Sequence, residues 1–154
     1  MKLLVFSDSH GRTSPMLDLI RAEQPDAVIH LGDGRADLEP LFWEWPELKL
    51  FSVPGNCDGW TGEPAQRLVE LEGMRFLLCH GHSYRVKSGL GGLLEEAKRL
   101  EVQCALYGHT HVAYREQVEG IWLFNPGSVG AYRAEYGVIE IENGVLTCEN
   151  KRMN

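Results

Sequence analysis

Short apolar runs that each end in a polar cluster recur along the chain, and this pattern restricts the fold more than any other feature. Five such runs occur, at residues 3–6, 27–29, 48–53, 76–79 and 104–107. Continuous apolar runs of this length are typical of strands buried on both faces. Apolar residues at helical spacing predict one helix between Ser14 and Pro25 and another over 90–100. Strand–helix–strand alternation predicts right-handed crossovers and a largely parallel sheet.

Turn signals predict hairpins in addition. Asn143-Gly144 separates two strand-like segments, 138–142 and 145–148, which is a strong hairpin signal. Glu72-Gly73 and Glu119-Gly120 separate further strand pairs in the same way. The strand content is therefore mixed and too large for one sheet covered by two helices. With 154 residues and no repeat or linker, a single domain over residues 1–154 is expected.

Charge and cysteine content restrict the partners and the compartment. Fifteen Lys and Arg against 22 Asp and Glu give a net charge of −7, which argues against a long nucleic acid as partner. Four cysteines without paired spacing indicate reduced thiols. The first apolar run is too short for a signal peptide, and no run is long enough to cross a membrane. We expect a cytoplasmic protein with no membrane partner.

The polar clusters carry the chemistry, because loops at the carboxyl ends of parallel strands converge on one crevice. Seven side chains are expected at this edge: Asp8, His10, Asp33, Asn56, His80, His109 and His111. Imidazoles mixed with carboxylate or amide oxygens suit Mn, Fe, Co, Ni or Zn. Seven ligands are more than one tetrahedral zinc ion can coordinate, and they fit two ions that share a bridging ligand. Asp33 is the natural bridge, since one carboxylate can offer an oxygen to each ion.

Each motif taken alone also has a plain structural interpretation. Asp33 after Gly32 and Asn56 after Gly55 are both common in turns. His30, between Ile29 and Leu31, is better explained as a core histidine or as a support behind the ligands. Chance explains the single motifs more easily than it explains five of them in order, each after a strand.

Together these residues resemble the calcineurin-like metallophosphoesterase superfamily. The matching motifs are Asp8-x-His10, Gly32-Asp33, Gly55-Asn56, His80 and Gly108-His109-x-His111, and the segment 125–128 is similar to its small bacterial and archaeal phosphodiesterases. The resemblance implies an α/β fold of mixed α+β type. This fold is a four-layer α-β-β-α sandwich, in which helices flank two mixed β-sheets.

The resemblance also implies roles for the seven side chains. Asp8, His10 and His111 would hold one divalent ion, and Asn56, His80 and His109 the other, with Asp33 bridging both. Mn is the expected metal, with Ni, Fe, Co and Zn as alternatives. A hydroxide that bridges the two ions would attack a small phosphodiester in line. Asp33, Asn56 and His82 are the expected catalytic residues of this phosphodiesterase.

The chain departs from many members of the superfamily at Cys57, where they have a histidine that assists catalysis. A thiol with a reference pKa of about 8.5 is a poor replacement for imidazole as an acid near neutral pH. Weak action on monoesters with poor leaving groups is therefore expected. Small phosphodiesterases of the family tolerate cysteine here, which favours that branch over a protein phosphatase.

Four further residues are candidates for substrate binding: Arg12, Arg35, Cys57 and Trp60. Either arginine could hold a phosphate, and a merely solvated side chain is the alternative. Trp60 could stack on a base, and packing at the edge of the core is the alternative. His82 could support the metal ligands or donate a proton, and a purely structural role is the alternative. Core packing best explains Phe42, Trp43 and Trp45, and a subunit interface comes second.

Two other functions stay open, a phosphomonoesterase with the same metals and a non-enzymatic protein-binding scaffold. A complete ligand set favours catalysis over the scaffold. A homodimer is also consistent with the resemblance. Two divalent ions, two aspartates and one hydroxide sum to about +1 at the site, so the net charge of −7 does not exclude phosphate. It restricts the expected partner to a small phosphodiester substrate.

Overall fold

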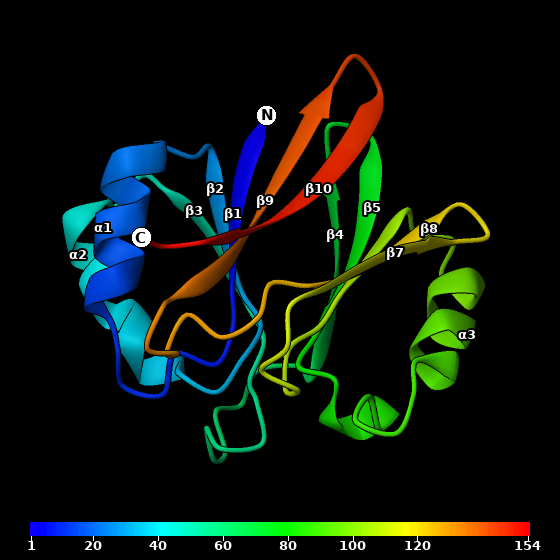
Figure 1. The fold of residues 1–154 in the computed structure, drawn as a ribbon, viewed down its shortest axis with the longest axis horizontal. Coiled ribbons are helices and arrows are strands. Elements are labelled where there is room, and N and C mark those ends of the chain that lie inside the picture. Colours follow the sequence, from blue (N-terminus) through cyan, green and yellow to red (C-terminus); the bar gives the residue numbers. More distant parts are fainter.

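The computed structural model describes residues 1–154 as two five-stranded sheets with helices on their outer faces (Figure 1). The first sheet has the order β10-β9-β1-β2-β3. Its strands are β1 (Lys2–Phe6), β2 (Ala27–His30), β3 (Lys49–Ser52), β9 (Glu135–Glu142) and β10 (Val145–Arg152). The second sheet has the order β4-β5-β6-β8-β7. Its strands are β4 (Gln66–Leu71), β5 (Met74–Cys79), β6 (Cys104–Leu106), β7 (Tyr114–Val118) and β8 (Ile121–Asn125).

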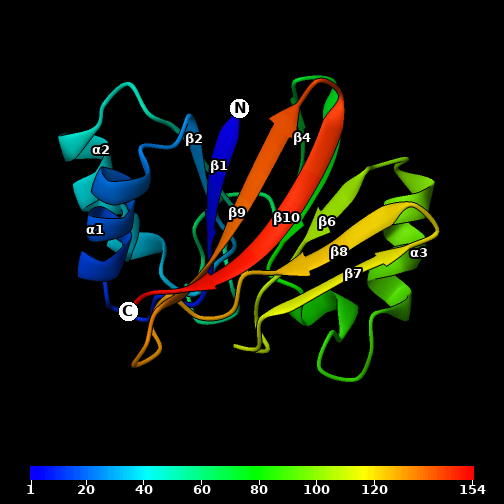
Figure 2. The ribbon, with the colours of Figure 1, turned by 45° about the horizontal axis from the view of Figure 1, so that its top comes forward.

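The helices lie on both sides of the paired sheets, as Figure 2 shows from a second direction. They are α1 (Ser14–Glu23), α2 (Glu39–Glu44) and α3 (Gly91–Arg99), with short 3₁₀ turns η1 (Arg35–Leu38) and η2 (His82–Tyr84). The helix α1 begins after Thr13 with Pro15 in its first turn, and it ends at the left-handed residue Gln24. No helix is both long enough and apolar enough to span a membrane.

Successive side chains of each strand point to opposite faces of its sheet, and together they form three layers of hydrophobic core. Leu3 and Val5 of β1 point between the sheets, into a cluster that includes Phe76 and Leu106 of the second sheet. The neighbouring Leu4 and Phe6 pack against α1 and α2. A third cluster joins α3 to the outer face of the second sheet. The four-layer α-β-β-α sandwich predicted from the sequence is therefore confirmed.

The three predicted hairpins are also present. The turns at Glu72-Gly73, Glu119-Gly120 and Asn143-Gly144 join antiparallel strand pairs, and both residues of each turn have positive φ. Two consecutive residues with positive φ define the type I′ turn, whose twist matches that of the flanking strands.

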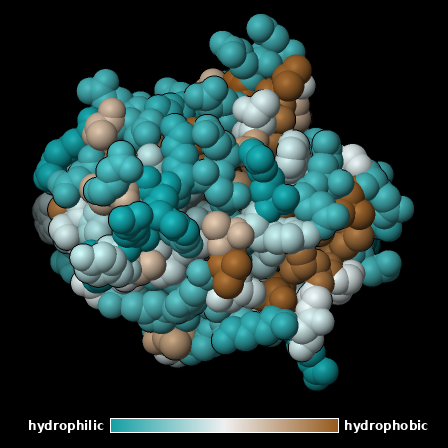
Figure 3. Space-filling model, in the orientation of Figure 1, coloured by the Kyte–Doolittle hydropathy of each residue, from teal (hydrophilic) through white to brown (hydrophobic).

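Three expectations about packing were wrong. Each sheet has two parallel and two antiparallel pairings, so neither is largely parallel. The strand β3 is half exposed, because it lies at the edge of its sheet. Phe42 and Trp43 are not core residues: they are 47% and 80% exposed on α2, while Trp45 packs against the core. Figure 3 shows one face of the molecule, on which hydrophobic residues gather beside the second sheet and α3.

Candidate metal centre

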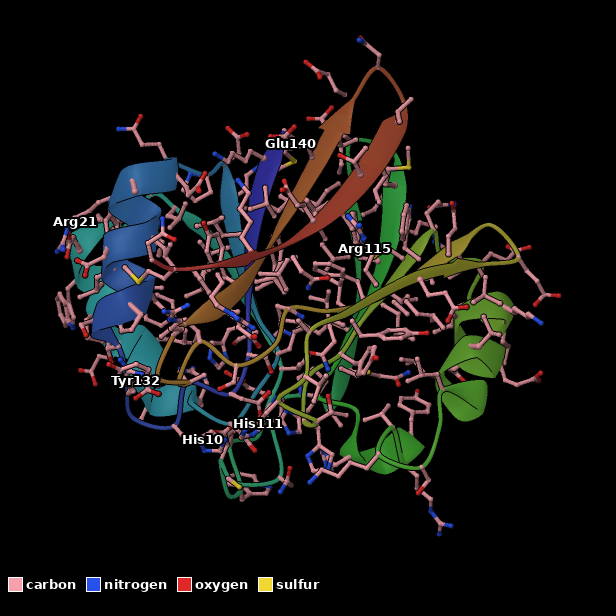
Figure 4. The ribbon with its side chains drawn as sticks, viewed as in Figure 1. His10, Arg21, His111, Arg115, Tyr132 and Glu140 are labelled. Atoms are coloured by element: carbon pink, nitrogen blue, oxygen red, sulfur yellow. The ribbon has the colours of Figure 1, made fainter.

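Two clusters of imidazoles and carboxylates form at the carboxyl ends of the central strands. Asp8, His10 and His111 form the first cluster, and Asp33, His80 and His109 form the second. Within each cluster the ligand atoms lie within 4.8 Å of one another. Figure 4 shows His10 and His111 together at one end of the molecule, although they come from loops about 100 residues apart. Six of the seven expected metal ligands are thus brought together.

One carboxylate oxygen in the first cluster has no hydrogen-bond partner. Asp8 Oδ1 is buried and unpaired, and it lies 3.2 Å from His111 Nε2 and 3.7 Å from His10 Nε2. The other oxygen, Oδ2, accepts hydrogen bonds from Ser7 Oγ at 2.6 Å and from the His109 backbone N–H at 3.0 Å. Burial of an unpaired charged oxygen is costly. A cation between these atoms would remove that cost.

Asp33 faces both clusters. Its Oδ2 lies 3.3 Å from His80 Nε2 and 3.8 Å from His10 Nε2. Its Oδ1 accepts a 2.8 Å hydrogen bond from the backbone N–H of Cys57. No Lys or Arg side chain pairs with Asp8 or Asp33, so imidazoles are the only basic side chains beside these two buried carboxylates. The residues present therefore fit divalent cations, with Asp33 at the position of a bridge.

The imidazole nitrogens also converge. His10 Nε2 and His111 Nε2 are 3.2 Å apart, and His80 Nε2 lies 3.2 Å from His109 Nδ1. His80 Nδ1 lies 2.7 Å from the carbonyl oxygen of Leu31, which fixes the proton on Nδ1 and leaves the Nε2 lone pair directed at the cluster. Burial and the neighbouring His80 lower the pKa of His109. This arrangement keeps the nitrogens available as ligands.

The backbone at the site is strained. Five of the six clustered residues have positive φ, namely Asp8, His10, Asp33, His109 and His111. Left-handed backbone at residues with a Cβ costs energy and persists only where the surrounding structure enforces it. Such strain concentrates at functional sites, and here it coincides with the candidate ligands.

Two glycines allow the ligand loops to approach each other. A Cβ on Gly32 would lie 2.5 Å from the backbone nitrogen of Gly55, and a Cβ on Gly55 would lie 2.1 Å from Asp33 Oδ1. Gly32 also has φ +100°. Any side chain at either position would push Asp33 away from the second cluster. The motifs Gly32-Asp33 and Gly55-Asn56 therefore need their glycines for steric reasons.

The carboxylate of Asp58 organises the Asp33 loop, a role that the sequence reasoning missed. It accepts four backbone N–H groups, from Asp33, Gly34, Arg35 and Gly55, at 2.7–2.9 Å. Burial raises the pKa of Asp58, but these four hydrogen bonds outweigh it and hold the pKa below its ordinary value. The N–H groups of Asp33, Gly34 and Arg35 converge on this acceptor only through the fold of the loop, so the sequence offered no signal for this role.

The remaining candidates lie around the clusters. The ring of His82 is 5.5 Å from that of His80 and 6.1 Å from that of His109. Burial and His80 lower the pKa of His82. Asn56 is exposed, with its amide 3.5 Å from Cys57 Sγ. Cys57 is also exposed, and a hydrogen bond with Asp33 raises the pKa of its thiol.

Neither arginine is merely solvated. Arg12 donates to the backbone carbonyls of Gly130 and Ala131, and Arg35 pairs with Glu63 at 2.8 Å. The alternative that Trp60 packs at the edge of the core is wrong, because its side chain is 94% exposed in the loop after Cys57. Tyr132, at 97%, is equally exposed, and Figure 4 shows it at the same end of the molecule as His10.

Comparisons with known proteins place this geometry in a family. Residues 1–144 match the model of the calcineurin-like phosphoesterase superfamily domain. A protein from Mycoplasma pneumoniae named "Probable metallophosphoesterase" is 35% identical over 83% of this chain and 79% of its own length. Phosphodiesterase YfcE of Escherichia coli is 30% identical over 96% of this chain and 90% of its own length.

A solved structure shows the same fold. A Streptococcus pneumoniae protein, described as a predicted phosphoesterase, superposes with a TM-score of 0.82 at 27% identity. The match covers 98% of this chain and 88% of that one. Family model, relatives and fold agree with the two clusters, and the chain belongs to the calcineurin-like phosphoesterase superfamily.

Proposed function

We propose that this chain is a metal-dependent phosphodiesterase that hydrolyses a small phosphodiester. The observation that carries the proposal is the unpaired, buried Asp8 Oδ1, which faces His10 and His111 beside the Asp33 cluster. The names of its relatives support the reaction class, since YfcE is a phosphodiesterase. The acidic surface of the chain, with its net charge of −7, favours a small substrate over a long nucleic acid.

The first cluster would hold one divalent ion and the second another, with Asp33 between them and Asn56 as a further ligand of the second. Two such ions, when bound, supply an activated water and stabilise the attacking and leaving oxygens of an in-line displacement at phosphorus. The protein keeps the ligands in place: Ser7 and the His109 N–H orient Asp8, and Leu31 orients His80. Manganese is our first choice of metal, with Ni, Fe, Co and Zn as alternatives, since imidazole and carboxylate donors without thiolate suit all five.

The leaving group distinguishes a diesterase from a monoesterase. Cys57 occupies the place of a histidine acid, and a thiol, with a reference pKa of about 8.5, is a poorer proton donor than imidazole near neutral pH. Substrates whose leaving oxygen needs no strong acid are therefore favoured. A phosphomonoesterase is the second candidate, because the same six clustered residues serve both reactions.

The test compares a chromogenic diester, bis(p-nitrophenyl) phosphate, with the corresponding monoester in Mn²⁺, Ni²⁺ and Zn²⁺. We expect a clear preference for the diester and no activity after chelation. The Asp33→Asn variant should lose activity with either substrate. A preference for the monoester would replace the diesterase by the second candidate. A protein that binds two ions and hydrolyses neither compound would instead favour a binding scaffold.

A further inference from the structure

A buried chain of hydrogen bonds lies behind the first metal cluster and includes none of its ligands. Ser9 Oγ donates to Asp37 Oδ2 at 2.6 Å and lies 3.1 Å from His30 Nε2. His30 Nδ1 accepts the backbone N–H of Gly32 at 3.2 Å. Ser9 and His30 are fully buried, and Asp37 is nearly so.

The direction of every proton in this chain follows from its neighbours. Because Gly32 donates to His30 Nδ1, the imidazole proton sits on Nε2 and points at Ser9 Oγ. Ser9 Oγ accepts that proton and therefore directs its own at the Asp37 carboxylate. The three side chains thus form one oriented unit, in which each group is satisfied by the next.

The unit joins three segments that carry or flank metal ligands. Ser9 stands between Asp8 and His10, which both have positive φ, at 56° and 44°. Asp37 Oδ2 also accepts the backbone N–H of Gly11 at 2.8 Å. It therefore holds Ser9 and Gly11, the residues on either side of His10. A Cβ on Gly34 would lie 1.8 Å from Ser9 Oγ, which places the loop of Asp33 directly against the same hydrogen bond.

We propose that Ser9, His30 and Asp37 form a positioning network that enforces the strained backbone of Asp8 and His10 and thereby sets the metal affinity of the first cluster. The proposal rests on the metal centre of the proposed function, but not on its substrate. The three residues touch no substrate and act only through the ligands. Groups that orient metal ligands typically change metal affinity 10- to 100-fold when they are removed.

The test is a Mn²⁺ titration of metal-free protein by calorimetry, in the wild type and in Ser9→Ala. Variants His111→Ala and His109→Ala assign the binding steps to the first and second clusters. We expect Ser9→Ala to raise the Kd of the first-cluster step about 10-fold or more. The Kd of the second-cluster step should stay within about twofold of the wild-type value. Tyr136→Phe is the matched control: it removes a 3.1 Å hydrogen bond to Glu23, the last residue of α1, and this bond involves no ligand and no residue of the network, so both steps should stay unchanged.

Variants of His30 separate positioning from packing. His30→Gln keeps a side-chain N–H that can reach Ser9 and should retain most of the first-step affinity, whereas His30→Leu should resemble Ser9→Ala. A metal-free readout, amide hydrogen exchange of residues 8–12, should accelerate in Ser9→Ala and His30→Leu only. The proposal is overturned if the first step is unchanged in Ser9→Ala, or if His30→Gln and His30→Leu lose affinity equally. A lack of catalysis would leave all of these measurements intact and would count against the proposed function alone.

Discussion

The carboxylate of Asp58 accepts a 2.8 Å hydrogen bond from the backbone N–H of Asp33, the residue that faces both metal clusters. The same carboxylate accepts three further N–H groups from the two loops that carry Asp33 and Asn56. A charged acceptor with four donors binds these loops more firmly than neutral hydrogen bonds would. The position of the bridging candidate therefore depends on a residue that no ion would touch.

Replacement of Asp58 should be costly for stability. We expect Asp58→Ala to lower the free energy of unfolding by about 2–4 kcal/mol, because it leaves four backbone N–H groups without their acceptor. Urea unfolding of the metal-free protein measures the change. Asp18→Ala removes an exposed carboxylate paired with Arg21 and should change stability by less than about 0.5 kcal/mol. Equal effects of the two variants would contradict the role given to Asp58.

Removal of one ligand should remove one ion. His111 belongs to the first cluster and His109 to the second, so His111→Ala and His109→Ala should each reduce the bound metal from two ions per chain to about one. Elemental analysis after dialysis against Mn²⁺ gives the ratio. His82→Ala is the comparison, since His82 lies outside both clusters and should retain two ions. If both cluster variants kept two ions, the assignment of ligands would be wrong.

Acid should destabilise the metal-free protein partly through His30. Burial lowers the pKa of His30 from 6.5 to about 4 in the folded protein, although nearby acids such as Asp58 oppose the shift. Between these values the unfolded chain binds a proton that the folded chain does not, so stability falls as the pH drops from about 6.5 to 4. Over this range the contribution of His30 to the free energy of unfolding changes by about 3 kcal/mol. Wild type and His30→Gln should differ in this slope, and parallel stability curves over that range would refute the assignment.

The reaction preference should respond to Cys57. We expect Cys57→His to raise monoester activity at least severalfold relative to diester activity, because imidazole protonates a poor leaving group more readily than a thiol does. The measurement is the ratio of kcat/KM for a monoester with a poor leaving group, such as phenyl phosphate, to kcat/KM for bis(p-nitrophenyl) phosphate in Mn²⁺. Cys57→Ser, which adds no acid of suitable pKa, should leave the ratio near that of the wild type. An unchanged ratio in Cys57→His would remove the basis for the role given to this position.

The exposed Trp60 should affect binding without affecting the fold. Its side chain is 94% exposed, so Trp60→Ala should change the free energy of unfolding by less than about 0.5 kcal/mol. If it stacks on an aromatic substituent of the substrate, KM for an aromatic diester should rise about fivefold or more while kcat changes little. Trp43→Ala, at another exposed tryptophan, should leave KM unchanged. Equal KM values in wild type and Trp60→Ala would remove Trp60 from the binding site.

Much of the fold could be predicted because the signals are local. Apolar runs such as Leu3–Phe6 form strands buried on both faces, and Asn143-Gly144 forms the predicted turn with both φ values positive. The edge strand β3 and the exposed Phe42 and Trp43 could not be predicted in this way. Burial there depends on which neighbours the rest of the chain supplies, and the residues themselves are as apolar as those of the core.

The sequence by itself determined the ligand types, their order and the ends of strands at which they lie. That information suffices to bring six of the seven expected ligands to one edge of the sandwich, because parallel strands end on the same side. Only the tertiary structure decided which side chains hold those ligands in place. Asp58 reaches the Asp33 loop from 25 residues away, and Asp37 reaches Ser9 from 28 residues away. Such contacts leave no periodic signal in the sequence, since each depends on the packing of two loops against each other.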